Sequence, residues 1–169
     1  MMAAVALAVG AMIASSPDLG KAEGQCRIDE SGPAFLVAVK GLKDRAGRLK
    51  LELYPDNDTD FLADDNVLIS HGKTFRRVEI TIPASGDVQL CIRAPGPGSY
   101  ALSLLHDRNG DRRFNLSGDG IGFPGDPKLG WSKPRAAQAQ ARVGTGPAHI
   151  AITLQYRQGL FHFGPLKER

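Results

Sequence analysis

Short segments in which apolar and polar residues alternate recur along the chain and constrain its fold more than any other feature. Successive side chains of a β-strand point to opposite faces, so this alternation predicts strands with one buried face and one solvated face. Lys50, Glu52 and Tyr54, for example, fall on the predicted solvated face of one such strand. The inward positions of the alternating segments are Leu49, Leu51 and Leu53; Val78, Ile80 and Ile82; Val88, Leu90 and Ile92; Tyr100, Leu102 and Leu104; and Ile150, Ile152, Leu154 and Tyr156.

Turn-forming residues separate these segments and indicate how the strands are arranged. Runs rich in Gly, Pro, Asn and Asp occupy 41–47, 55–60, 83–86 and 95–98. Strands at such short spacing predict an all-β fold, an antiparallel β-sandwich of immunoglobulin-like or prealbumin-like architecture. Residues 35–39 are apolar at every position, which predicts a strand that is more central than the others.

One alternating segment, residues 137–143, has two interpretations. Its alanines alternate with Gln138, Gln140 and Arg142, which predicts a strand that the Gly-rich run 144–147 turns into the last strand. The alternative is a short alanine-rich helix.

Composition and charge restrict the class of protein. The chain has 169 residues with 20 Gly and 11 Pro but no fixed period, which indicates one turn-rich globular domain rather than collagen or a disordered chain. The net charge is only +3, and the basic residues are scattered instead of forming one basic face. We therefore expect no nucleic-acid partner.

The amino-terminal segment predicts export from the cytoplasm. Met2 to Ala14 form an apolar stretch that suits a secretory signal and is too short to cross a bilayer. Cleavage after Ser16 or after Ala22 fits the small residues that follow, and we expect residues 1–22 to be the signal peptide and 23–169 the sandwich. The mature chain would then be periplasmic or secreted, without a transmembrane segment. No Lys or Arg precedes the stretch, and a buried terminal strand is the alternative.

Cys26 and Cys91 are the only cysteines, which excludes a four-cysteine zinc site and a C-x-x-C redox pair. In an oxidising compartment we expect them to form a disulfide that closes a loop of 65 residues; the alternative is two unrelated buried thiols. Cys91 alternates with Leu90 and Ile92, so the predicted bridge lies outside the main core and pins the amino-terminal arm to the outer face or edge of a sheet.

The segment 106–120 is dense in oxygen ligands. Asp107, Asn109 and Asp111 occupy positions one, three and five of a calcium-loop pattern, which makes them the candidate metal ligands and calcium the candidate cofactor. The pattern then fails, because Arg112 replaces the glycine of position six and Asp119 comes one residue after position twelve. The alternative is a turn in which these side chains accept backbone hydrogen bonds without a metal.

No catalytic set emerges from the sequence. His106 precedes Asp107, but neighbouring residues of a strand point to opposite faces, so we expect His106 to be a hydrogen-bonded structural residue rather than a base. Phe123 and Trp131 lie in the glycine-rich segment 118–134, where they either cover an open end of the sandwich or line a shallow ligand site.

Three passages resemble a family of exported bacterial proteins catalogued as domain of unknown function 2141. They are VAVKGLKDRAGRLKLELY at 37–54, GSYALSLLHDRNGDRRFN at 98–115 and GIGFPGD at 120–126. The resemblance implies an exported β-sandwich without established enzymatic activity. Relatives read closer to HDENGNGKLD at the oxygen-rich loop, so Arg108, Arg112 and Arg113 depart toward positive charge here and weaken the metal interpretation.

These observations together predict a non-enzymatic accessory or ligand-binding module of the bacterial envelope, whose partner is an envelope protein or a small ligand. A calcium-stabilised binding module that uses the loop from Asp107 to Asp119 is the alternative, and a hydrolase built around His106 is a more distant one. A pocket formed by Phe123, Trp131 and the loop after His106 would favour ligand binding over a purely structural role.

Overall fold

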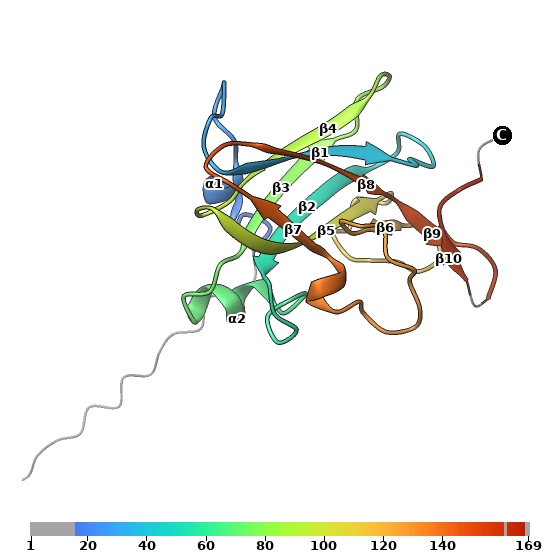
Figure 1. Ribbon diagram of the computed structural model, residues 1–169. Helices are drawn as coiled ribbons and strands as arrows, with labels where there is room; N and C mark the ends of the chain where they lie inside the picture. The colour runs from blue at the N-terminus through green and yellow to red at the C-terminus, as the bar shows by residue number, and fades with distance from the viewer. Residues whose placement is uncertain (1–15, 161, 168–169) are drawn as a thin grey trace, which may run out of the picture.

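The computed structural model describes residues 16–160 and 162–167 and is composed mainly of strands (Figure 1). The predicted signal segment at 2–14 lies outside the described residues. None of the described helices is long and apolar enough to cross a membrane. The elements in chain order are α1 Lys21–Gly24, β1 Ala34–Lys40, β2 Arg48–Pro55, α2 Asp65–Ser70, β3 Arg76–Thr81, β4 Val88–Arg93, β5 Gly98–Asp107, β6 Gly120–Gly122, the 3-10 turn η1 Ala136–Gln138, β7 Gln140–Val143, β8 Ala148–Thr153, β9 Gln155–Arg157 and β10 Phe163–Gly164.

The strands form two sheets, which confirms the predicted all-β sandwich. The small sheet has the order β4-β1-β8, and the large one has the order β10-β9-β6-β5-β2-β3, with β7 paired to the first half of β5. β1 is the central strand of the small sheet, as its uniformly apolar sequence predicted. Inward side chains of both sheets meet in one core that includes Phe35, Leu51, Leu90 and Leu104.

Two features at the carboxyl-terminal end differ from the predicted antiparallel arrangement. β8 runs parallel to β1, because residues 144–147 carry the chain from β7 in the large sheet to the small sheet and do not form a hairpin. The predicted strand at 150–156 is divided at Leu154, whose backbone N–H donates to the Lys40 carbonyl oxygen at 2.9 Å. Residues before Leu154 pair with β1, and those after it pair with β6.

The outer face of the large sheet is covered, which the alternation did not predict. Glu52 and Tyr54, expected on a solvated face, are only 6% and 4% exposed. They lie beneath a second apolar cluster that includes Phe61, Phe75 and Phe123 and is supplied by the connections around α2 and after β6. The Tyr54 hydroxyl donates to the Glu52 carboxylate at 2.7 Å, so the buried polar atoms have partners.

The segment 137–143 combines its two predicted conformations. Its first half forms the 3-10 turn η1, and only residues 140–143 form a strand, β7. Ala139, Ala141 and Val143 are buried at every second position, as the alternation predicted. The glycine-rich segment 118–134 contains one short strand, β6 Gly120–Gly122, which pairs with β5 and which no alternation predicted.

The amino-terminal arm, residues 16–33, covers two edge strands, β3 of the large sheet and β4 of the small sheet. α1 lies against β3, where the Arg77 backbone N–H donates to the Gly20 carbonyl oxygen and Lys21 forms an ion pair with Glu79 at 3.0 Å. A cut after Ala22 falls inside α1, whereas a cut after Ser16 leaves these contacts intact. The folded unit therefore includes residues that the predicted 1–22 signal segment would remove.

The Cys26–Cys91 disulfide fixes the same arm to the other sheet. Its Cα atoms are 5.9 Å apart, and the neighbouring Gln25 forms an isolated β-bridge with Ile92 on the edge strand β4. The bridge lies outside the main core at a sheet edge, so both its pairing and its place agree with the prediction.

Replacing both Cys26 and Cys91 by Ser will lower the free energy of unfolding by about 4 kcal/mol, because the unfolded chain regains the freedom of a 65-residue loop. Urea denaturation at equilibrium, followed by circular dichroism, measures this loss. Reduced wild-type protein should match the double variant. A difference below about 1 kcal/mol between oxidised and reduced protein would contradict the stabilising role assigned to the bridge.

Candidate functional site

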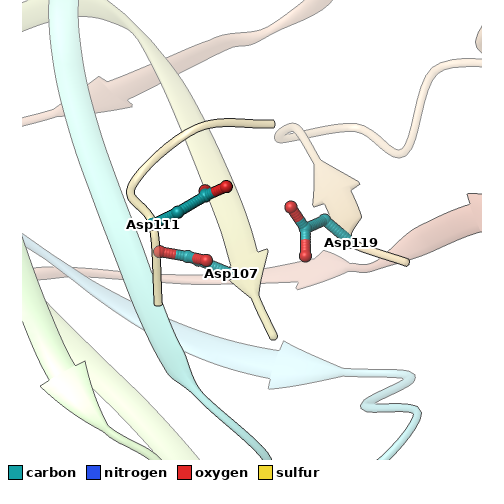
Figure 2. Close-up of side chains that lie close together, drawn as sticks. All are labelled: Asp107, Asp111 and Asp119. Carbon is teal, nitrogen blue, oxygen red and sulfur yellow. The ribbon is translucent and has the colours of Figure 1, made fainter. Parts of the chain in front are cut away.

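The carboxylate loop, residues 108–119, connects β5 to β6 and, together with Asp107 at the end of β5, brings three carboxylates together. β5 ends at Asp107, and the loop returns through Asp119 to β6, which pairs with the end of β5. One oxygen each of Asp107, Asp111 and Asp119 lies within 4.8 Å of the others, and their side chains face a shared space (Figure 2). The structure thus brings together two of the candidate ligands named from the sequence, Asp107 and Asp111, and adds Asp119, which the calcium-loop pattern left one residue after position twelve.

Backbone groups of the loop already bind the two buried carboxylates. Asp107 accepts the N–H of Gly110 at 2.8 Å and that of Arg112 at 2.7 Å. Asp119 accepts the N–H groups of Arg108 and Asn115 at 2.9 and 2.8 Å. Backbone hydrogen bonds of this kind were expected of the turn that is the alternative to a calcium loop, and each carboxylate oxygen keeps a second lone pair.

Asn109 and Asp111 form the exposed side of the cluster. The Asn109 side-chain amide donates to Asp111 at 3.0 Å, and its oxygen accepts the Asp111 N–H at 3.2 Å. The pKa of Asp111 is lowered mainly by the hydrogen bond that its carboxylate accepts from the Asn115 side chain. The hydrogen bond from the Arg113 backbone N–H lowers this pKa further. Asp111 is therefore anionic at neutral pH.

Two arginines of the loop are turned toward other acids. Arg108 donates from Nε and Nη2 to the Asp44 carboxylate at 2.9 and 2.5 Å, which lowers the pKa of Asp44 and raises that of Arg108. Arg112 lies 3.4 Å from Glu79 on β3. Its φ of 64° is the left-handed backbone for which the calcium-loop pattern places glycine at position six. The loop thus makes this turn without glycine, at a cost of about 1–2 kcal/mol.

His106 is fully buried beside the loop and has both ring nitrogens engaged. Nδ1 lies 2.6 Å from the Tyr156 hydroxyl, and Nε2 lies 2.9 Å from the Ala46 carbonyl oxygen. The phenol also accepts the Lys43 N–H at 3.1 Å, so it donates to Nδ1 while Nε2–H donates to Ala46. Burial lowers the pKa of His106 and raises that of Tyr156 to about 12, so both are neutral. This arrangement agrees with the predicted structural role of His106.

An apolar hollow opens on the other side of the same loop. Its cavity volume is about 400 Å³, and its walls include Phe114, Leu116, Phe123, Leu129, Trp131 and Phe163. Phe114 from the loop contacts Phe163 of β10, with ring centroids 6.2 Å apart. Segments distant in sequence therefore build one concave apolar surface.

Phe123 and Trp131, the two aromatic residues of the segment 118–134, have different environments. Phe123 is 1% exposed and packs against Phe61, so it covers the outer face of the large sheet instead of an open end of the sandwich, and it also lines the hollow. Trp131 is 72% exposed and lines the hollow, so the covering interpretation is wrong for Trp131. The proline and glycines around Trp131 form no regular element that would hold its ring against the core.

Comparison with known proteins identifies a family without a described activity. The model of a bacterial family, described as uncharacterized protein conserved in bacteria (DUF2141), matches residues 37–151. Neither the curated proteins nor the solved structures contain a match. The matched segment begins inside β1, runs through β2 to β7 and ends inside β8, so it includes the loop from Asp107 to Asp119 and most of the hollow's walls.

Stability will fall as the pH drops from about 7 to 5.5, because the unfolded chain protonates a histidine near its ordinary pKa of about 6.5 whereas buried His106 resists protonation. His106→Gln should flatten this slope, which is at most about 1.4 kcal/mol per pH unit, and should also lower stability at pH 7.5. Urea denaturation at several pH values gives the slope.

His149→Gln is the matched control, since His149 is exposed on β8. This variant should keep the wild-type slope. Equal slopes in wild type and His106→Gln would contradict the assignment of a neutral buried His106.

Proposed function

We propose that this chain, which belongs to the bacterial DUF2141 family, is a non-enzymatic ligand-binding module of the cell envelope. The observation that carries the proposal is the apolar hollow of about 400 Å³ between the carboxylate loop and the segment around Trp131. Its size lies within the range of small-molecule sites, which are concave and mainly apolar. Phe123, Trp131 and the loop after His106 all contribute to it, which is the arrangement that favours ligand binding over a structural role.

The disulfide supports a location outside the cytoplasm. Disulfides persist outside the reducing cytoplasm, so the Cys26–Cys91 bridge indicates a protein that resides outside it. A periplasmic or secreted location, reached through a signal peptide at the amino terminus, extends this proposal. Cleavage after Ser16 fits the contacts of α1 with β3 better than cleavage after Ala22 does.

The chemistry of the buried polar residues supports a binding role without catalysis. His106 uses one nitrogen to accept from Tyr156 and the other to donate to Ala46, so no lone pair remains to take a proton from a substrate. Arg77 is likewise held by Glu52 and Asp65, at 2.7 and 3.0 Å. These groups stabilise the sheet that carries the hollow.

Trp131 is the chain's single tryptophan and reports directly on the hollow. We expect the neutral dye N-phenyl-1-naphthylamine to bind with micromolar affinity and to quench Trp131 emission by energy transfer. Leu116→Asp places a charge in the apolar wall and should weaken binding of the dye at least tenfold, which a fluorescence titration measures.

Ile28→Asp provides the matched control. Ile28 is 96% exposed in the amino-terminal arm and does not line the hollow. Dye binding should be unchanged in this variant. Absence of dye binding to the wild type, or equal affinities in Leu116→Asp and Ile28→Asp, would overturn the proposed function.

A calcium-stabilised loop is the second candidate function, and one observation favours it. Two of the three arginines that weigh against a cation in the sequence are paired elsewhere, Arg108 with Asp44 and Arg112 with Glu79, whereas the charge of Arg113 acts on Asp111. The three carboxylates of Asp107, Asp111 and Asp119 offer hard oxygen ligands, which suit calcium. Bound calcium would tie the loop that forms one wall of the hollow to the end of β5.

Calcium at 10 mM should raise the free energy of unfolding by about 1–3 kcal/mol if the site has the affinity of extracellular calcium modules. Differential scanning calorimetry with and without calcium measures the gain. Asp119→Asn should abolish it, whereas Asp87→Asn, which removes an exposed carboxylate elsewhere, should leave it unchanged. No gain in the wild type, or the same gain in Asp119→Asn, would eliminate this candidate.

A further inference from the structure

The apolar hollow has a smaller neighbour on the other side of Trp131. This second hollow has a cavity volume of about 140 Å³. Leu116, Leu129, Gly130, Trp131 and Phe163 line both hollows, so the two are adjacent parts of one surface depression. A ligand longer than one hollow can therefore extend past the Trp131 ring into the other.

Exposed apolar side chains gather around this depression. Among the described residues, five large hydrophobic side chains are exposed, and four of them line one of the two hollows: Phe114, Leu116, Trp131 and Leu160. Exposed apolar patches on a folded domain mark binding sites more often than scattered residues do. The depression is thus suited to bind the apolar part of a ligand.

The charged residues of the depression all have the same sign. Lys133 lines the larger hollow and Arg157 the smaller one, and no acidic side chain of the described residues lines either. The chain as a whole carries nearly equal numbers of acidic and basic residues, 18 against 21, so this one-sided lining is local. It favours an anionic ligand over a cationic one.

The two cations differ in what they already bind. Lys133 donates to the carbonyl oxygens of Phe61 and Asp58 at 2.8 and 3.3 Å, which holds its ammonium at the protein surface. Among the described residues, Arg157 donates only from Nε, to the Gly159 carbonyl oxygen at 2.9 Å. Its terminal guanidinium nitrogens have no hydrogen bond or ion pair with any of residues 16–160 or 162–167, and its fork of donors fits a carboxylate or another acidic group.

We infer that the ligand is an amphipathic organic anion whose apolar chain lies in the larger hollow and whose acidic group binds Arg157 in the smaller one. This inference rests on the proposed function, because it names the chemical class that the Trp131 hollow accepts. The apolar walls supply affinity through burial of the chain, and Arg157 supplies the preference for negative charge. A monomeric fatty acid in water has this chemistry, and so does an acidic lipid in a membrane; the volume of the larger hollow, which is within the range of small-molecule sites, favours the free molecule.

Three ligands of equal chain length test the inference: decanoate and decylamine, each used below its critical micelle concentration, and decan-1-ol, used below its solubility limit in water. Each competes with N-phenyl-1-naphthylamine, whose binding tests the hollow itself. We expect decanoate to displace the dye at about tenfold lower concentration than decylamine, with decan-1-ol between them. Arg157→Gln should remove this preference and Arg157→Lys should restore part of it, whereas Arg142→Gln, which changes an exposed arginine of β7 outside the depression, should keep it.

The outcomes separate the inference from the proposed function. If the dye does not bind, the proposed function fails and the inference fails with it. If the dye binds but the three ligands compete equally, or Arg157→Gln leaves the preference intact, the hollow binds ligands without selecting anions and only the inference is wrong. Binding to vesicles of phosphatidylglycerol without displacement of the dye by monomeric decanoate would show a membrane-docking surface and would also overturn the inference.

Discussion

Burial of the last seven residues of β5 is the constraint on which the arrangement of this protein depends. Leu102 and Leu104 face the core between the sheets, and Ala101 faces the second cluster on the outside. The strand ends in two polar residues, His106 and Asp107, whose side chains are 0% and 1% exposed. Because water cannot reach them, their polar atoms need hydrogen-bond partners within the protein. Tyr156 and Ala46 are these partners for His106, and the N–H groups of the loop are the partners for Asp107.

The loop that satisfies Asp107 also creates the binding surface. Hydrogen bonds that Asp107 and Asp119 accept from backbone N–H groups fold residues 108–118 back toward β6, which places Phe114 and Leu116 opposite the segment around Trp131. The exposure of Phe114 and Leu116 is thus a consequence of how the loop closes the polar end of β5. Phe114 and Leu116 belong both to the carboxylate loop and to the wall of the hollow. A change in the conformation of the loop would therefore change the shape of the hollow.

The sequence predicted those parts of the fold that repeat with a fixed period. Alternation identified β2, β4 and β5, and it placed Cys91 on the outer side of β4, because strand geometry leaves only two directions for a side chain. It did not predict the burial of Glu52 and Tyr54, since their cover comes from irregular connections that have no period. The parallel pairing of β8 with β1 was also missed, because no local signal records which sheet a strand joins after a crossover.

The site was predicted only in part, for related reasons. Counting positions along a known loop pattern located Asp107 and Asp111, but Asp119 reaches the cluster through pairing of β6 with β5, which a count along the chain does not include. Trp131 was recognised as unusual because of the segment that carries it. The exposure of Trp131 and the place of Arg157 in the smaller hollow depend on where β9 and β10 lie. The sequence predicted one continuous strand at 150–156 and so gave no indication of this arrangement.

Binding of an amphipathic anion in the depression around Trp131 can be tested by a heteronuclear NMR titration of the oxidised protein with decanoate. We expect saturable shifts of the Trp131 indole resonance and of backbone amides at Phe114, Leu116, Leu129 and Arg157, with the amides of β1 and β4 unchanged. If these resonances do not move, or if the shifts concentrate on the exposed edge of the small sheet, the depression is not the binding site.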